Sequence, residues 1–115
     1  NLSTLVSFLD PVDPYKLPEV YNSYQICLNL TDSGSLDKTI VEASACGVIP
    51  LVANSSLKGI LPEVCVTDTE KESITSSLRK LLDDYVRISI EKDLESFVKS
   101  QSLFSLSSKL FMELK

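Results

Sequence analysis

Short apolar runs and amphipathic stretches alternate along the chain. Apolar runs cover residues 5–9, 26–30 and 48–53, and a polar segment follows each of them. Runs of this length next to turn residues are typical of buried strands. A briefer run at residues 64–66 predicts a fourth strand. Because continuous apolar runs indicate strands that are covered on both faces, the pattern predicts a parallel sheet.

The segments between these runs carry apolar residues at helical spacing. Residues 16–24 and 36–46 predict two helices, and Gly47 stands where a left-handed residue would end the second. A third helix is expected to begin at Thr69, where Glu72 completes a capping box. Helices in these places would serve as the crossovers that parallel strands need.

The last third of the chain has a helical pattern throughout. Residues 86–97 and 106–114 predict two helices, with a serine-rich break at residues 102–105. The whole pattern predicts one α/β domain over residues 1–115, a Rossmann-like parallel sheet with helices on both faces. Since the chain does not begin with Met, we expect this domain to be an incomplete part of a longer protein.

The composition excludes several kinds of catalytic and binding site. The 115 residues include no histidine, which excludes Ser-His-Asp and Cys-His catalysis and most zinc sites. The net charge of −5 would repel a phosphate backbone, so a nucleic acid is not an expected partner. Cys27, Cys46 and Cys65 lie in apolar runs, which predicts reduced, buried thiols in a cytoplasmic protein. We expect no metal, no cofactor and no transmembrane segment.

The candidate binding residues lie between the second and third predicted strands. Ligands of parallel sheets bind beyond the carboxyl ends of the strands, which here means the loops after Leu30 and Ala53. The helix that follows Leu30 presents free N–H groups and a positive dipole end, and both attract phosphate. Three small residues and one cation surround this helix start, and a carboxylate stands on its second turn: Ser33, Gly34, Ser35, Lys38 and Glu42.

Each of these residues also has a plainer interpretation. Ser35 is expected to cap the helix, and Lys38 and Glu42 could form an exposed pair four residues apart. Alternatively, Glu42 accepts two hydrogen bonds from adjacent hydroxyls, such as those of a ribose. Asp37 opposes anion binding, because a carboxylate in the first turn offsets the dipole.

A longer motif surrounds Glu42. Residues 38–53, KTIVEASACGVIPLVA, resemble the LEAMACG-x-PV signature of retaining glycosyltransferases with the GT-B fold, in the group 1 or glycogen-synthase-like family. Residues 17–28 are similar to the helix and strand that precede this signature, and residues 6–9 to the strand before them. Phe104-Ser105 resembles the FSW sequence before the last helix of the family. The resemblance covers most of the chain, but its specific part is the run at residues 38–53.

The resemblance implies a function and a division of roles. It implies that the chain is the later part of the C-terminal, donor-binding domain of an enzyme that uses a nucleotide-diphosphate sugar with retention. An upstream acceptor-binding domain would be its partner, so this part alone would not catalyse transfer. In the family, two glutamates with seven residues between them bind the donor, and the second, at Glu42, is implied to hold the ribose. The first, which contacts the sugar, would fall at Gly34, with Asp32 and Asp37 the nearest carboxylates.

Two other functional classes stay open. The glycine at position 34 is also compatible with a non-catalytic scaffold or binding domain that kept the fold and lost the donor-sugar site. A receiver-like signalling domain would instead need an acidic phosphate acceptor at a strand end, such as Asp10 or Asp32. It would also need a lysine at a later strand end, and Lys58 fits that position poorly.

Overall fold

The fold is a small α/β domain. The computed structural model describes residues 2–32, 34 and 37–113, with the side chains described up to residue 101. Its helices and strands are, in order, α1 (Leu17–Asn22), β1 (Ile26–Asn29), α2 (Lys38–Ala45), β2 (Ile49–Val52), α3 (Lys71–Leu81) and α4 (Asp84–Glu113). Short 3₁₀ turns occupy Leu2–Thr4, Pro14–Lys16, Ser55–Leu57 and Glu63–Cys65.

The sheet is parallel, as predicted. β1 pairs with β2 in a register that places Ile26 opposite Ile49. A single parallel bridge between Val66 and Val52 continues the sheet on the other side of β2. The N–H of Thr67 donates a hydrogen bond of 2.8 Å to the Val52 carbonyl oxygen beside this bridge. All three segments therefore direct their carboxyl ends to one edge of the sheet.

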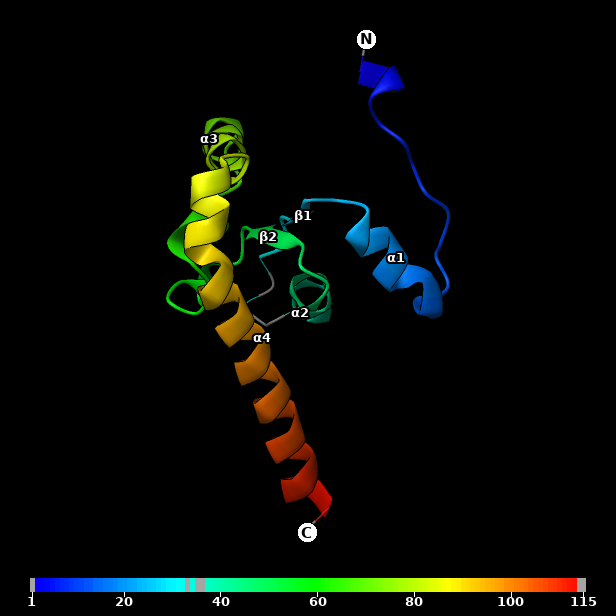
Figure 1. The fold of residues 1–115 in the computed structure, drawn as a ribbon, viewed down its shortest axis with the longest axis vertical. Coiled ribbons are helices and arrows are strands. Elements are labelled where there is room, and N and C mark those ends of the chain that lie inside the picture. Colours follow the sequence, from blue (N-terminus) through cyan, green and yellow to red (C-terminus); the bar gives the residue numbers. More distant parts are fainter. Residues whose placement is uncertain (1, 33, 35–36, 114–115) are drawn as a thin grey trace.

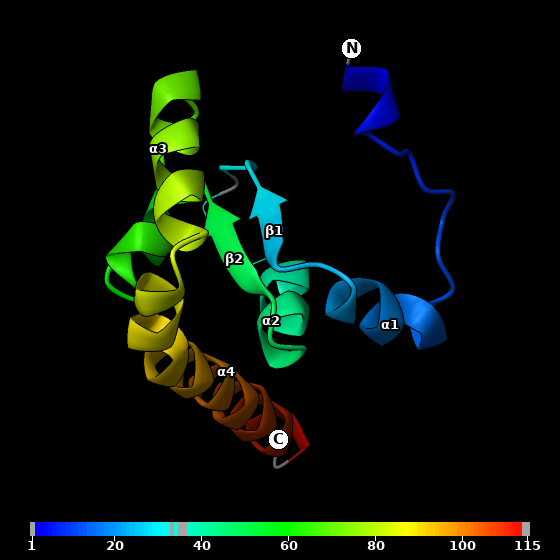
Figure 2. The same cartoon turned by 45° about the horizontal axis from the view of Figure 1, so that its top comes forward.

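Three helices pack around this sheet. α2 contacts β1, β2 and α4, while α3 contacts β2 and α4. Figures 1 and 2 show α3 and α4 together on one side of β2, with α1 and the N-terminal segment on the opposite side of the sheet, beyond β1. The core contains apolar side chains from α2, β2, α3 and α4, among them Ile40, Leu51, Leu81, Ile90 and Phe97. Burial of these side chains is the main force that holds the layers together.

The helix and strand predictions around the candidate site are confirmed. Residues 26–29 and 49–52 form strands, and residues 38–45 form a helix. Gly47 has a φ of 81°, the left-handed conformation expected after the end of that helix. No helix in the described ranges is both long and apolar enough to cross a bilayer.

The strand predicted at residues 5–9 is wrong. These residues form no regular structure, and Phe8 is 97% exposed. A strand requires a neighbour for its backbone hydrogen bonds and a layer on which to pack its side chains. Residues 5–9 have neither, because the chain runs well away from β1 before α1 begins (Figure 1).

Two predictions near the third helix are also wrong. Glu63–Cys65 forms a 3₁₀ turn, so only Val66 of the predicted fourth strand pairs with the sheet. The helix begins at Lys71 and not at Thr69, and Glu70 at its N-cap makes no side-chain capping bond. Asp68 accounts for the difference, because its carboxylate accepts hydrogen bonds from the Glu70 N–H and the Ser73 hydroxyl. This local bonding favours a turn at the residues where the capping box was expected.

The predicted break at residues 102–105 is absent, since α4 runs without interruption from Asp84 to Glu113. Serine has only a modest helix penalty, and its hydroxyl can return a hydrogen bond to the preceding turn. Ser100 shows this bonding, with its hydroxyl 2.8 Å from the Phe97 carbonyl oxygen. Serines therefore do not end a helix that has an apolar face to bury.

Candidate functional site

α2 begins at the carboxyl end of β1, where the Asn29 side chain donates a hydrogen bond to Asp37. Its first residue is Lys38, and it buries Ile40, Ala43 and Ser44 against the rest of the domain. The Ser44 hydroxyl donates a hydrogen bond of 2.8 Å to the Ile40 carbonyl oxygen, inside the helix. Small side chains on this face let the helix lie close to the strands. The helix that the site requires is thus present.

The N-cap of α2 is Asp37, so the prediction that Ser35 caps the helix is wrong. One carboxylate oxygen of Asp37 accepts hydrogen bonds from the Thr39 N–H at 2.9 Å and the Thr39 hydroxyl at 2.8 Å. The other oxygen accepts a bond of 3.0 Å from the side-chain amide of Asn29, at the end of β1. These bonds lower the pKa of Asp37 below its ordinary value of 3.8, with the Thr39 N–H the largest cause. A permanent negative charge therefore sits at the helix start.

Glu42 lies on the second turn of α2 and is partly buried. Burial is the largest cause of the raised pKa of Tyr21 in α1, and the negative charge of Glu42 is the next largest. The Glu42 carboxylate makes no hydrogen bond or ion pair with the described part of the chain. Its oxygens are free to accept hydrogen bonds from a ligand.

Of the other predicted residues, the structure describes Lys38 and Gly34. Lys38 is exposed at the first turn of α2, one turn before Glu42. Gly34 is exposed and has a φ of 77°, a conformation that L side chains rarely adopt. Ser33 and Ser35 lie outside the described residues. The loop thus has a backbone shape at position 34 that suits glycine better than the glutamate that the resemblance implies there.

A concave region, the strand-end pocket, lies at the carboxyl ends of the parallel segments. It has a volume of 940 Å³. Asp32 reaches it from the loop after β1, and Ala53 from the end of β2. Thr67, which follows the bridging residue Val66, contributes from the third parallel segment. The pocket therefore occupies the edge where parallel sheets bind their ligands.

The strand-end pocket mixes charges of both signs with hydroxyl groups. Lys58 and Lys80 line it, and neither forms an ion pair within the described ranges. The hydroxyl oxygen of Thr67 is buried without a hydrogen-bond partner in the structure. A buried, unpaired hydroxyl costs free energy unless a ligand or water bonds to it. Because this oxygen has almost no accessible surface, it does not face the pocket, and the groups open to a ligand are the charged side chains at the pocket surface.

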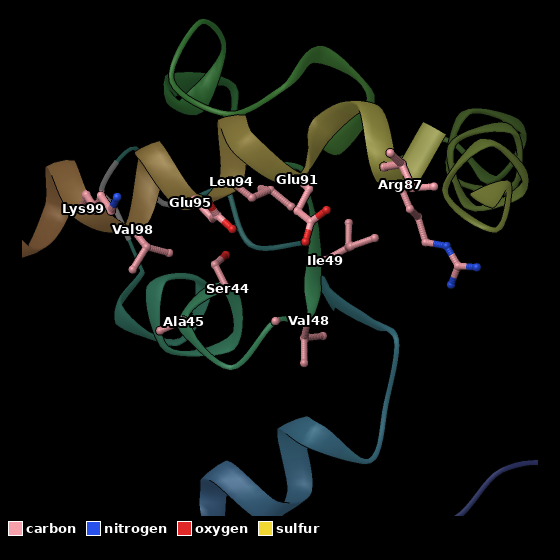
Figure 3. A pocket seen from close by; sticks show the side chains of 12 residues that line it. Ser44, Ala45, Val48, Ile49, Arg87, Glu91, Leu94, Glu95, Val98 and Lys99 are labelled. Carbon is pink, nitrogen blue, oxygen red and sulfur yellow. The ribbon is translucent and has the colours of Figure 1, made fainter. Parts of the chain in front are cut away.

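Another concave region, the helix groove, lies between α2 and α4 (Figure 3). It has a volume of 510 Å³, and Glu91 and Glu95 extend from α4 toward Ser44 of α2. Val48 and Ile49, at the amino end of β2, form part of its wall. The groove is therefore at the opposite edge of the sheet from the strand ends, and it contains none of the predicted binding residues.

The cysteines are all free thiols. Cys65 is fully buried, whereas Cys27 and Cys46 are only partly buried. Burial raises the pKa of Cys65 to about 12, and burial is also the first cause of the raised pKa of Cys27. In the described part of the chain, no three His, Cys, Asp or Glu side chains are grouped so that they could hold a metal ion.

The sequence predicts ligand binding at the same edge of the sheet as the strand-end pocket, but most residues of this pocket are not among the predicted ones. Lys58, Thr67 and Lys80 come from segments far apart in the sequence, and no motif connects them. The available signal was the density of hydroxyl residues at positions 67–77, directly after the last apolar run. Comparison with known proteins finds no family model, no curated protein and no solved structure that matches this chain.

Proposed function

We propose that the chain is the donor-binding part of a retaining glycosyltransferase that uses a nucleotide-diphosphate sugar. In this proposal the fold is the later part of a Rossmann-like domain of the GT-B type, and an upstream domain binds the acceptor. The three free thiols are compatible with a reducing, cytoplasmic location. The main support is the motif at residues 38–53 together with the placement of its glutamate.

The observation that carries the proposal is the state of Glu42. The side chain is partly buried and makes no hydrogen bond or ion pair with the described part of the chain. A solvated surface glutamate would be fully exposed, and a structural glutamate would have a partner. An unpaired carboxylate suits a ribose, whose two adjacent hydroxyls each donate a hydrogen bond.

A second candidate is a glycosyltransferase-like domain that binds no donor and serves as a scaffold. Asp37 is the observation that favours it. This carboxylate caps α2 and remains ionised, and thereby offsets the dipole that would attract a diphosphate. Lys38 is the one cation of the predicted site, and it carries a single opposing charge. Diphosphate binding in the first candidate therefore depends on cations outside the predicted site.

Titration of the intact protein with nucleoside diphosphates tests the first candidate. UDP, GDP and ADP would be compared by calorimetry for the wild type and for Glu42→Ala. Loss of two hydrogen bonds to a charged acceptor is expected to weaken binding about a hundredfold or more, since each bond contributes about 1.5–3 kcal/mol. Glu72→Ala, which removes an exposed glutamate of α3, is the matched control and should bind as the wild type does.

The outcomes separate the two candidates. Tight binding that depends on Glu42 but not on Glu72 supports the donor-binding domain. A wild type that binds none of the three nucleotides, and that transfers no sugar from UDP-glucose, GDP-mannose or ADP-glucose, indicates the scaffold. Binding that is the same in Glu42→Ala and the wild type would refute the assignment of Glu42 to the ribose.

A further inference from the structure

We infer that the helix groove between α2 and α4 is a docking site for a basic amphipathic helix of a partner protein. The inference goes beyond the proposed function and does not depend on it, because the groove includes the residues at the amino end of β2, at the opposite edge of the sheet from the strand ends. Three features support it: the length of the groove, its apolar floor, and two carboxylates that have no partner in the described part of the chain.

The groove runs along a considerable length of α4. Its wall on this side extends from Arg87 to Lys99, and the opposite wall extends from Ser44, in α2, to Ile49, at the start of β2. A helix rises about 1.5 Å per residue, so the α4 wall is about 18 Å long, or about three helical turns. Grooves between helices that extend over several turns are suited to bind a further helix.

The floor of the groove is apolar. Val48 and Ile49 are buried there, and Leu94 and Val98 of α4 are partly buried and pack against the core. The fold therefore holds these four side chains in place before any partner arrives. Ile88 stands at one end of the groove with 68% of its surface exposed. A partner that covers Ile88 would remove apolar surface from water, which favours association.

Two carboxylates border this floor. Glu91 and Glu95 lie four residues apart on α4, and both extend across the groove toward α2 (Figure 3). Neither forms a hydrogen bond or an ion pair with a residue that the structure describes. Like charges four residues apart on a helix repel each other and destabilise it. Cationic groups in the groove would relieve this repulsion, so the groove favours a basic ligand.

The cations of the groove leave this charge uncompensated. Arg87, at one end, is paired with Asp84. Lys99, at the other end, stands one turn beyond Glu95 but forms no ion pair within the described ranges. The net charge of −5 on the whole chain also attracts a cationic partner at long range. The electrostatic requirement of the groove is therefore for positive charge near its centre.

These features define the partner by its chemistry. Its apolar residues should recur at intervals of three and four, so that one face of the helix covers the floor. Beside that face, two lysines or arginines four residues apart would lie opposite Glu91 and Glu95. Such side chains can lay their apolar stems along the groove while their charged ends reach the carboxylates.

Fluorescence anisotropy with designed peptides tests the inference on the intact protein. The probe is a labelled peptide of about 20 residues, long enough to form a helix, with leucines on one face and lysines four residues apart beside them. A second peptide carries glutamate in place of each lysine. We expect the basic peptide to bind with micromolar affinity and the acidic peptide to bind about tenfold more weakly or less.

Variants locate the binding in the groove. The double variant Glu91→Gln with Glu95→Gln should weaken binding of the basic peptide about tenfold, because two charge pairs are lost. Ile88→Ala should weaken it about fivefold through lost apolar contact. The matched control is Glu70→Gln with Glu72→Gln, which removes two exposed carboxylates at the start of α3. It changes the net charge equally and should bind within about twofold of the wild type.

Several outcomes would overturn the inference. Equal losses in the groove variant and the control variant would show that the net charge alone attracts the peptide. Equal affinities for the basic and the acidic peptide, or no binding of either, would also refute it. Light scattering tests the other occupant: a dimer of the wild type that Ile88→Ala dissociates would assign the groove to a second copy of this chain.

The result is separable from that of the proposed function. Glu42 does not line the groove, so Glu42→Ala should bind the basic peptide as the wild type does. Peptide binding that persists in a protein without nucleotide affinity would support the docking site while refuting the donor-binding assignment. Nucleotide binding without peptide binding would have the opposite meaning.

Discussion

The cap of α2 offers a direct test of the local physics, through Asp37→Ala. This change removes the acceptor for the Thr39 N–H and the acceptor for the Asn29 side-chain amide. The first loss corresponds to an N-cap, about 1 kcal/mol. The second corresponds to one hydrogen bond at the surface, also about 1 kcal/mol. We therefore expect the free energy of unfolding to fall by about 2 kcal/mol, measured by denaturant titration at neutral pH.

Asp37→Ser is the matched variant. Serine caps helices about as well as aspartate, but it is too short to reach Asn29 as the aspartate does. The serine variant should therefore lose about half as much stability as the alanine variant, near 1 kcal/mol. Equal losses for serine and alanine would show that capping contributes nothing, and a loss below about 0.5 kcal/mol for alanine would refute the whole argument.

The pH dependence follows from the lowered pKa of Asp37. The native pKa lies below 3.8, the ordinary value that the carboxyl regains on unfolding. The native state therefore binds the proton less readily than the unfolded state, and the stabilisation by the charge is present above the unfolded pKa. It is lost as the pH falls through the native pKa. The difference in stability between the wild type and Asp37→Ala should thus narrow below pH 3.8, and a constant difference at more acidic pH would contradict this reasoning.

Two further predictions concern the core. Leu81 is fully buried in α3, so Leu81→Ala should lower the free energy of unfolding by about 3 kcal/mol in a denaturant titration. Leu82, its neighbour, is 58% exposed, so Leu82→Ala should lower the same free energy by less than about 1 kcal/mol. Similar losses at both positions would contradict the observed packing. The Cys65 thiol has a pKa of about 12 and is buried, so iodoacetamide at pH 8 should leave it unmodified in the folded protein and alkylate it in urea, as read by mass spectrometry. Rapid alkylation of Cys65 without urea would show that it is accessible.

The sequence predicts the centre of the fold well, because local signals and tertiary packing agree there. Residues 26–29, 38–45 and 49–52 combine apolar runs, helical spacing and a glycine in the left-handed position, and all of them lie against the core. The strand expected at residues 5–9 fails because apolar character alone cannot form a strand without a neighbour. Its side chains are exposed, as Phe8 shows.

The errors at helix starts have a different cause. Ser35 and Thr69 are both of good capping residue types, but a nearby aspartate accepts the main-chain hydrogen bond at each place. Asp37 accepts from Thr39, and Asp68 accepts from Glu70. A carboxylate in the chain can cap a helix or close a turn, and sequence spacing alone does not decide between these uses. The residues of the strand-end pocket could not be predicted from the sequence for a third reason. They lie far apart in the sequence and come together only when the three parallel segments align.

The outer edge of β1 gives the sheet an open side. In the part of the chain that the structure describes, β1 pairs only with β2, and its other row of main-chain groups has no strand beside it. Leu28 on this strand is 46% exposed. Such an edge is a template on which any extended polypeptide can add itself by main-chain bonding alone. The four residues of β1, which lead into the candidate site, would therefore also mediate self-association of this chain at high concentration.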